Sequence, residues 1–161
     1  MPQLFLPLLL SSLISLPLLA WAQAHDPSQH HRQDAAAPAD NRQAVSFPQP
    51  LRTHTLANMR DHLAALAEIQ AALARNDYDQ AADIAENRLG LSSLRSHGAH
   101  EVAPYMPQAM RDAGTAMHRS ASRFATVAKN ASVTGDLNAA VGALAQLNQT
   151  CVACHAGFRL K

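Results

Sequence analysis

The chain of 161 residues has few of the residues that anchor most small domains. Aromatic residues make up 4% of it, the single tryptophan is Trp21, and there are only two cysteines. Positive and negative charges nearly cancel, with 13 Lys and Arg against 12 Asp and Glu and a formal net charge of +1. This balance gives no reason to expect nucleic acid or an anionic membrane surface as a partner. Two cysteines also leave no second ligand pair for a structural zinc site.

The start of the chain has the pattern of a secretory signal peptide. Residues 4–21 are apolar apart from serines and two prolines, and Ala22-Gln23-Ala24 is a small-residue cleavage site. We therefore expect a signal peptide over residues 1–24, although no Lys or Arg precedes the apolar run. An uncleaved membrane anchor is the alternative, and the prolines and serines argue against it. After cleavage we expect no membrane span.

Residues 25–50 mix Pro, Gln, Asp, Ala and His without an apolar period, so we expect a flexible leader. It contains three histidines, and a short His-rich tract can bind metals. We favour a solvated tether, because no acidic or cysteine ligands converge there. The three histidines are His25, His30 and His31.

Beyond Pro50, proline is missing from residues 51–103 and 108–161, which are rich in strong helix formers. Apolar residues recur there at spacings of three and four, and no stretch alternates with period two, so we expect helices and no strands. The expected fold class is all-α, an antiparallel four-helix bundle over residues 51–161. The expected helices cover about 52–75, 78–89, 107–131 and 137–158, with an irregular crossover over 91–105.

The two cysteines lie together near the end of the chain, in Cys151-Val152-Ala153-Cys154-His155. This C-x-x-C-H pattern is the attachment signature of c-type haem. On a helix, Cys151 and Cys154 share a face and can both reach the vinyl groups along one edge of a porphyrin, while His155 can ligate the iron. A redox disulfide would need a strand–helix context that the sequence lacks. We expect one covalent haem, attached on the apolar stripe of the last helix and directed into the core.

A four-helix bundle with C-x-x-C-H on its last helix resembles the class II c-type cytochromes, the cytochrome c′ family. The resemblance covers about residues 51–161, and the family often has Tyr followed by Arg or Lys where this chain has Phe158 and Arg159. It implies a haem environment that includes Phe158, Arg159 and Leu63. Since c-type haem is attached outside the cytoplasm, it also implies a periplasmic location. Family members are often antiparallel dimers, so a homodimer is a further expectation.

The ligand on the side of the iron opposite His155 then distinguishes an electron carrier from a gas-binding protein. The resemblance implies that the first helix crosses that face, where low-spin members place a methionine and high-spin members leave the position vacant. Met59 lies near the centre of the apolar stripe expected for this helix, and its soft thioether suits haem iron. We expect His155 and Met59 as metal ligands. The alternatives are that Met59 is core filler, that His62 is the ligand in its place, or that the position is vacant. A histidine at the edge of the stripe is more often half-solvated, which argues against His62. The stripe comprises Leu56, Met59, Leu63, Leu66 and Leu73, with Ile69 at its margin.

These residues predict a periplasmic carrier of single electrons that works with redox protein partners. An enzyme is not expected, because the sequence has no nucleophile–base pair, phosphate loop or paired carboxylates. The alternative is a five-coordinate, high-spin protein that binds nitric oxide or carbon monoxide. His97, His100 and Glu101 have no fourth ligand nearby in the sequence, so we expect them at the surface.

If the signal peptide is cleaved after Ala24, the secreted protein begins at His25. Expression of the full chain in a bacterium with a periplasm, followed by N-terminal sequencing of the periplasmic fraction, checks this. A chain that keeps Met1 and stays with the membranes would contradict it.

Overall fold

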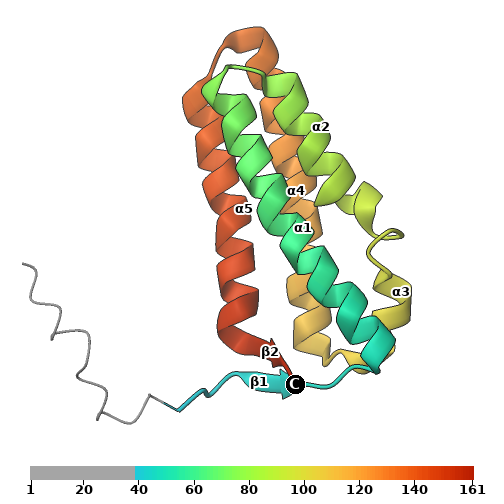
Figure 1. Cartoon of the computed structure of the whole chain (residues 1–161). Coiled ribbons are helices and arrows are strands. Elements are labelled where there is room, and N and C mark those ends of the chain that lie inside the picture. The colour runs from blue at the N-terminus through green and yellow to red at the C-terminus, as the bar shows by residue number, and fades with distance from the viewer. Residues whose placement is uncertain (1–38) are drawn as a thin grey trace, which may run out of the picture. The chain divides into compact units, whose positions relative to one another are not determined.

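The computed structural model describes residues 39–161, which are mostly helical (Figure 1). The expected all-α class is therefore confirmed. The expected signal peptide, the first part of the expected leader and its three histidines lie outside the described residues. The helices are α1 Gln49–Ala74, α2 Tyr78–Arg88, α3 Ala99–Val102, α4 Gln108–Thr134 and α5 Leu137–Gly157, and the strands are β1 Gln43–Val45 and β2 Phe158–Leu160.

The four longer helices lie side by side, and the turns α1–α2 and α4–α5 are at the same end (Figure 1). The most extensive contacts join α4 to α5 and to α2, and α2 to α1. Local signals set the boundaries at this end. The carboxylates of Asp77 and Asp136 accept hydrogen bonds from the first turns of α2 and α5, as N-caps do. Gly135, with φ of 73°, ends α4 in the left-handed conformation that glycine adopts without strain.

Small side chains dominate the core between these helices. Phe124, Ile69 and Leu147 are the largest fully buried apolar side chains. Most of the others are alanines, which let neighbouring helix backbones approach closely. The fully buried alanines are Ala65, Ala72, Ala81, Ala85, Ala121, Ala128 and Ala140.

The inward face of α1 differs from the expected stripe. Ile69 is fully buried, whereas Leu63 is 70% exposed. The buried residues of α1 also include His62 and Ala65, which are not part of the expected apolar stripe. Because α1 packs on α2 through small side chains, its buried face is the alanine-bearing one and Leu63 points to solvent. Leu63, which we expected in a haem environment, therefore lies mostly in solvent.

Two short strands, which we did not expect, join the ends of the described chain. β1 pairs in parallel with β2, with Gln43 opposite Phe158 and Val45 opposite Leu160. Val45 and Phe47 are buried, so a flexible leader is wrong for residues 40–50, and Phe158 belongs to a strand and not to the last helix. Strands of three residues are too short to show alternation, and partners at opposite ends of the chain leave no local signal.

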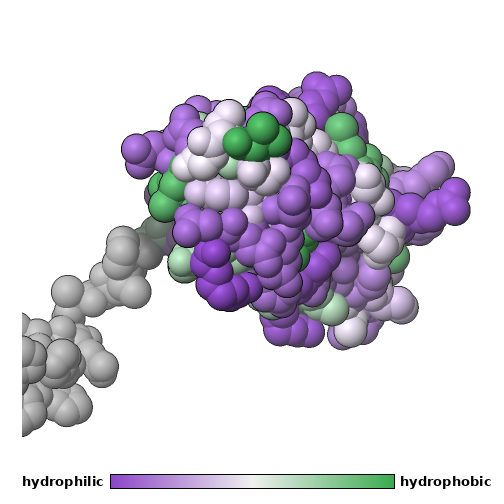
Figure 2. All heavy atoms as spheres, turned by 90° about the horizontal axis from the view of Figure 1, so that it is seen from above, coloured by the Kyte–Doolittle hydropathy of each residue, from purple (hydrophilic) through white to green (hydrophobic). Residues whose placement is uncertain are grey.

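No helix among residues 39–161 is long and apolar enough to cross a bilayer. The face of the molecule in Figure 2 is mostly hydrophilic, with small and separate hydrophobic patches. Isolated patches of this kind are normal for a protein surface.

Two matched truncations on α1 test which of its faces is buried. Ile69→Ala should lower the free energy of unfolding by about 2–5 kcal/mol, because it leaves a cavity in the core. Leu63→Ala should change it by less than about 0.5 kcal/mol, because Leu63 is mostly in solvent. Denaturant unfolding of both variants measures the difference, and equal losses would contradict the observed face.

Candidate functional site

A cavity of about 560 Å³ lies where α1 and α4 begin and α5 ends. Its wall comes from the first half of α1, the crossover that contains α3, the first half of α4, the end of α5, and β2. This volume is typical of a site for a cofactor or another small molecule. Much of the lining is apolar, contributed by Leu56, Leu94, Val102, Met106, Met110, Met117, Phe158 and Leu160.

The three chemically distinctive residues of the C-x-x-C-H motif all line this cavity from α5. The thiols of Cys151 and Cys154 are half-buried and form no disulfide. Burial raises the pKa of both thiols, and the neighbouring Cys151 raises that of Cys154 further. His155 is exposed, at the mouth of the cavity. The helix therefore presents two protonated thiols and an accessible imidazole to one space.

Residues of α1 line the same cavity from the side opposite α5, and they include both side chains considered as iron ligands. Met59 is half-buried, and His62 is only 9% exposed. The expectation of a half-solvated His62 is therefore wrong. The Nε2 atom of His62 and the hydroxyl of Thr55 are buried without a hydrogen-bond partner. An unpaired buried polar atom costs about 1–3 kcal/mol, so each of these atoms needs a partner.

His62 is the first of three imidazoles in a row along the cavity wall. The ring centroids of His62 and His97 are 4.8 Å apart, and those of His97 and His118 are 5.4 Å apart. At the far end, Nδ1–H of His118 donates to the carbonyl oxygen of Leu89 (2.7 Å). The expectation that His97 lies at the surface is wrong, because the crossover folds it into the wall; His100 is exposed as expected.

Two of these imidazoles, those of His62 and His97, carry little charge at neutral pH. Burial lowers the pKa of His62 to about 4, helped by His97, His118 and His155, while Asp61 acts in the opposite direction. Burial also lowers the pKa of His97. His62 is thus a neutral imidazole, the form that can bind a metal.

Four guanidinium groups also line the cavity, and no Asp or Glu does so in the part of the chain that the structure describes. The carboxylate of Asp40, which does not itself line the cavity, forms salt bridges with Arg42 (2.8 Å) and Arg159 (3.1 Å). Arg52 and Arg111 each donate to a backbone carbonyl oxygen at 2.6 Å. The cavity therefore suits an apolar body that bears anionic groups. Sequence reasoning proposed only Arg159, because the other three come from distant segments.

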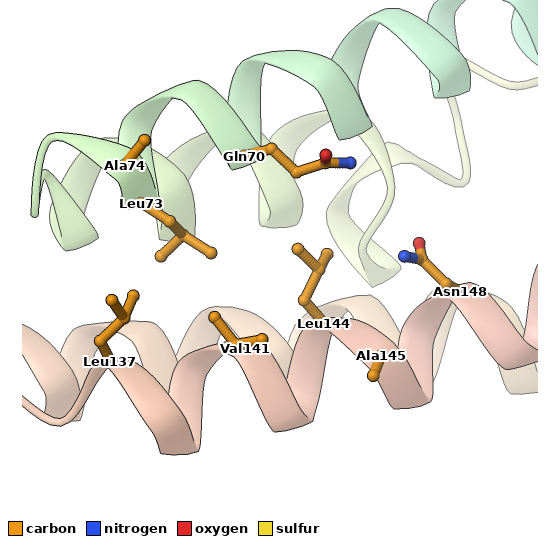
Figure 3. Close-up of a pocket in the computed structure, with 8 residues that line it drawn as sticks. All are labelled: Gln70, Leu73, Ala74, Leu137, Val141, Leu144, Ala145 and Asn148. Atoms are coloured by element: carbon orange, nitrogen blue, oxygen red, sulfur yellow. The ribbon is translucent and has the colours of Figure 1, made fainter. Parts of the chain in front are cut away.

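A second hollow lies between α1 and α5, at the other end of the molecule (Figure 3). It measures about 390 Å³, and Leu73 of α1 and Leu144 of α5 point into it. Leu137 and Val141 of α5 border it and are 39% and 49% exposed. Its lining contains no cysteine, histidine or charged residue, so it has none of the chemistry of the larger cavity.

Comparisons with protein families, curated proteins and solved structures found no match for this chain. Within residues 39–161, no group of three or more His, Cys, Asp and Glu side chains is arranged to hold a metal ion. A haem iron, by contrast, brings the four porphyrin nitrogens and needs only one or two protein ligands. The absence of a larger ligand cluster among the described residues therefore does not conflict with a haem in this cavity.

In protein prepared without a prosthetic group, lowering the pH from 6.5 towards 4 should reduce the free energy of unfolding. In this window the unfolded chain binds a proton at His62 that the folded chain, with its pKa of about 4, does not. The loss should reach about 2–3 kcal/mol by pH 4. Urea unfolding at several pH values measures it. His62→Gln should flatten this dependence, whereas the exposed His100→Gln should leave it unchanged; a slope that His62→Gln does not alter would contradict a buried, neutral His62.

Proposed function

We propose that the protein is an exported c-type cytochrome that carries single electrons, with one haem bound covalently in the larger cavity. The observation that carries the proposal is that Cys151, Cys154 and His155 all line this cavity, opposite a wall that contains Met59 and His62. The volume and apolar lining of the cavity suit a porphyrin. Its four guanidiniums, with no carboxylate among the lining residues described, suit the propionates. The unpaired Nε2 of His62 also fits a cavity that has an occupant.

Each motif residue has a defined task in this proposal. Cys151 and Cys154 would hold a bound haem through thioethers formed from their thiols and its two vinyl groups, and His155 would supply an imidazole nitrogen to the iron. When bound, the haem supplies an iron that changes between the ferric and ferrous states. Arg159 and the other lining arginines compensate the propionate charges. Because α5 holds both cysteines and His155, the ligand geometry changes little on electron transfer.

The helix arrangement supports membership of the cytochrome c′ family as part of the proposal. The four longer helices lie side by side and the motif lies at the end of the last of them, which supports the antiparallel four-helix bundle that the resemblance implies. We place the protein in the periplasm, where it exchanges electrons with redox protein partners. The exposed position of His155 leaves that edge of the site open to such a partner.

Residues of α1 would supply the second ligand of a bound haem iron, or leave that position vacant. The sequence-based hypothesis assigns it to Met59, which lines the cavity as that hypothesis requires. His62 lines the cavity too, one helical turn further along. A vacant position would instead make the protein a receptor for nitric oxide or carbon monoxide. Occupation by either side chain gives a six-coordinate, low-spin haem suited to electron transfer.

The proposal predicts that the exported protein keeps its haem through denaturing electrophoresis. Peroxidase staining of the gel should detect it in the wild type and in the control Val152→Ala, since Val152 is exposed and outside the cavity. Staining should be lost in the double variant Cys151→Ala/Cys154→Ala, which cannot form thioethers. An unstained wild-type band, from cells shown to attach haem to another c-type cytochrome, would refute the proposal.

A further inference from the structure

We infer that His62, and not Met59, is the side chain of α1 that ligates the iron opposite His155, so that the haem has two histidine ligands. This inference rests on the proposed function, because it needs a haem in the cavity. It departs from the sequence-based hypothesis, and three features of the structure support it.

The first feature is the unpaired nitrogen of His62. The residue is nine-tenths buried, lines the cavity, and has an Nε2 atom with no hydrogen-bond partner. Leaving such an atom unpaired costs free energy, which a bond to an occupant of the cavity removes. Met59 has no comparable requirement, because its thioether packs well against apolar neighbours without a partner. Of the two side chains, only His62 is unsatisfied while the cavity has no occupant.

The second feature is the relation between His62 and His155. Both residues line the cavity, His155 from α5 and His62 from α1. A planar group held by Cys151 and Cys154 therefore has one imidazole on α5 and another on the opposite wall.

The third feature is the support behind His62. The ring of His97 lies against it at 4.8 Å between centroids, and the ring of His118 lies behind His97. His118 is anchored by its bond to Leu89, and the amide of Asn58 donates to the carbonyl oxygen of His97 (3.1 Å). Ligands supported in this way keep their orientation, which tunes a metal site and limits rearrangement during electron transfer.

Two imidazole ligands would have two consequences for the proposed electron carrier. The reduction potential would be lower than with a His and Met pair, because a thioether ligand raises it. The iron would also be closed to nitric oxide and carbon monoxide unless His62 moved away.

The test uses the exported, haem-loaded protein and compares Met59→Leu, which keeps the side-chain volume, with His62→Ala. Absorption, electron paramagnetic resonance and near-infrared magnetic circular dichroism spectra report the spin state and the axial ligands. We expect a low-spin wild type without the sulfur-to-iron charge-transfer band, and an unchanged Met59→Leu. His62→Ala should become high-spin and return to low-spin when free imidazole is added. The exposed His100→Ala is the matched control and should behave as the wild type.

Several outcomes would overturn the inference: a sulfur-to-iron band or a high-spin spectrum in the wild type, or a high-spin Met59→Leu. If His62→Ala does not fold, the wild-type spectra alone decide, because they distinguish sulfur from nitrogen ligation. Absence of covalent haem would refute the proposed function itself. Covalent haem with methionine ligation, or with a vacant position, refutes only the assignment of His62.

Discussion

The structure depends on helices that pack closely over much of their length and separate at one end. Alanines allow the close approach of α1 to α2, α2 to α4 and α4 to α5, while longer side chains surround a cavity of about 560 Å³ at the other end. An apolar occupant of matching size would shield the apolar side chains of this lining from water, so folding and cofactor binding are coupled in the proposal.

The polar groups around the cavity divide into two kinds. The guanidiniums stay charged and are held by Asp40 or by backbone carbonyl oxygens. The imidazoles of His62 and His97 are kept neutral by burial. Permanent positive charge suits carboxylates, whereas neutral imidazole suits a metal. Under the proposed function, one lining would thus provide for both the acidic groups and the iron of a haem.

The short parallel pair of β1 and β2 connects the two ends of the described chain to this site. It places Arg42 from one end beside Arg159 from the other, with Asp40 between them, and Lys161 donates to the carbonyl oxygen of Val45 (3.0 Å). The segment before α1 is therefore part of the cavity wall. We expect truncations that reach residue 40 to affect the site as well as the fold.

The sequence by itself determined the helical class, the two turns α1–α2 and α4–α5, and the motif. Those signals are local: Asp77 and Asp136 cap helices, Gly135 ends one, and C-x-x-C-H lies within five residues. Only the tertiary structure decided which face of α1 is buried, because that depends on what α1 packs against. Ile69 and His62 turn inward and Leu63 outward for this reason. The same holds for the row of histidines and for the four arginines, since segments far apart in the chain meet only when it folds.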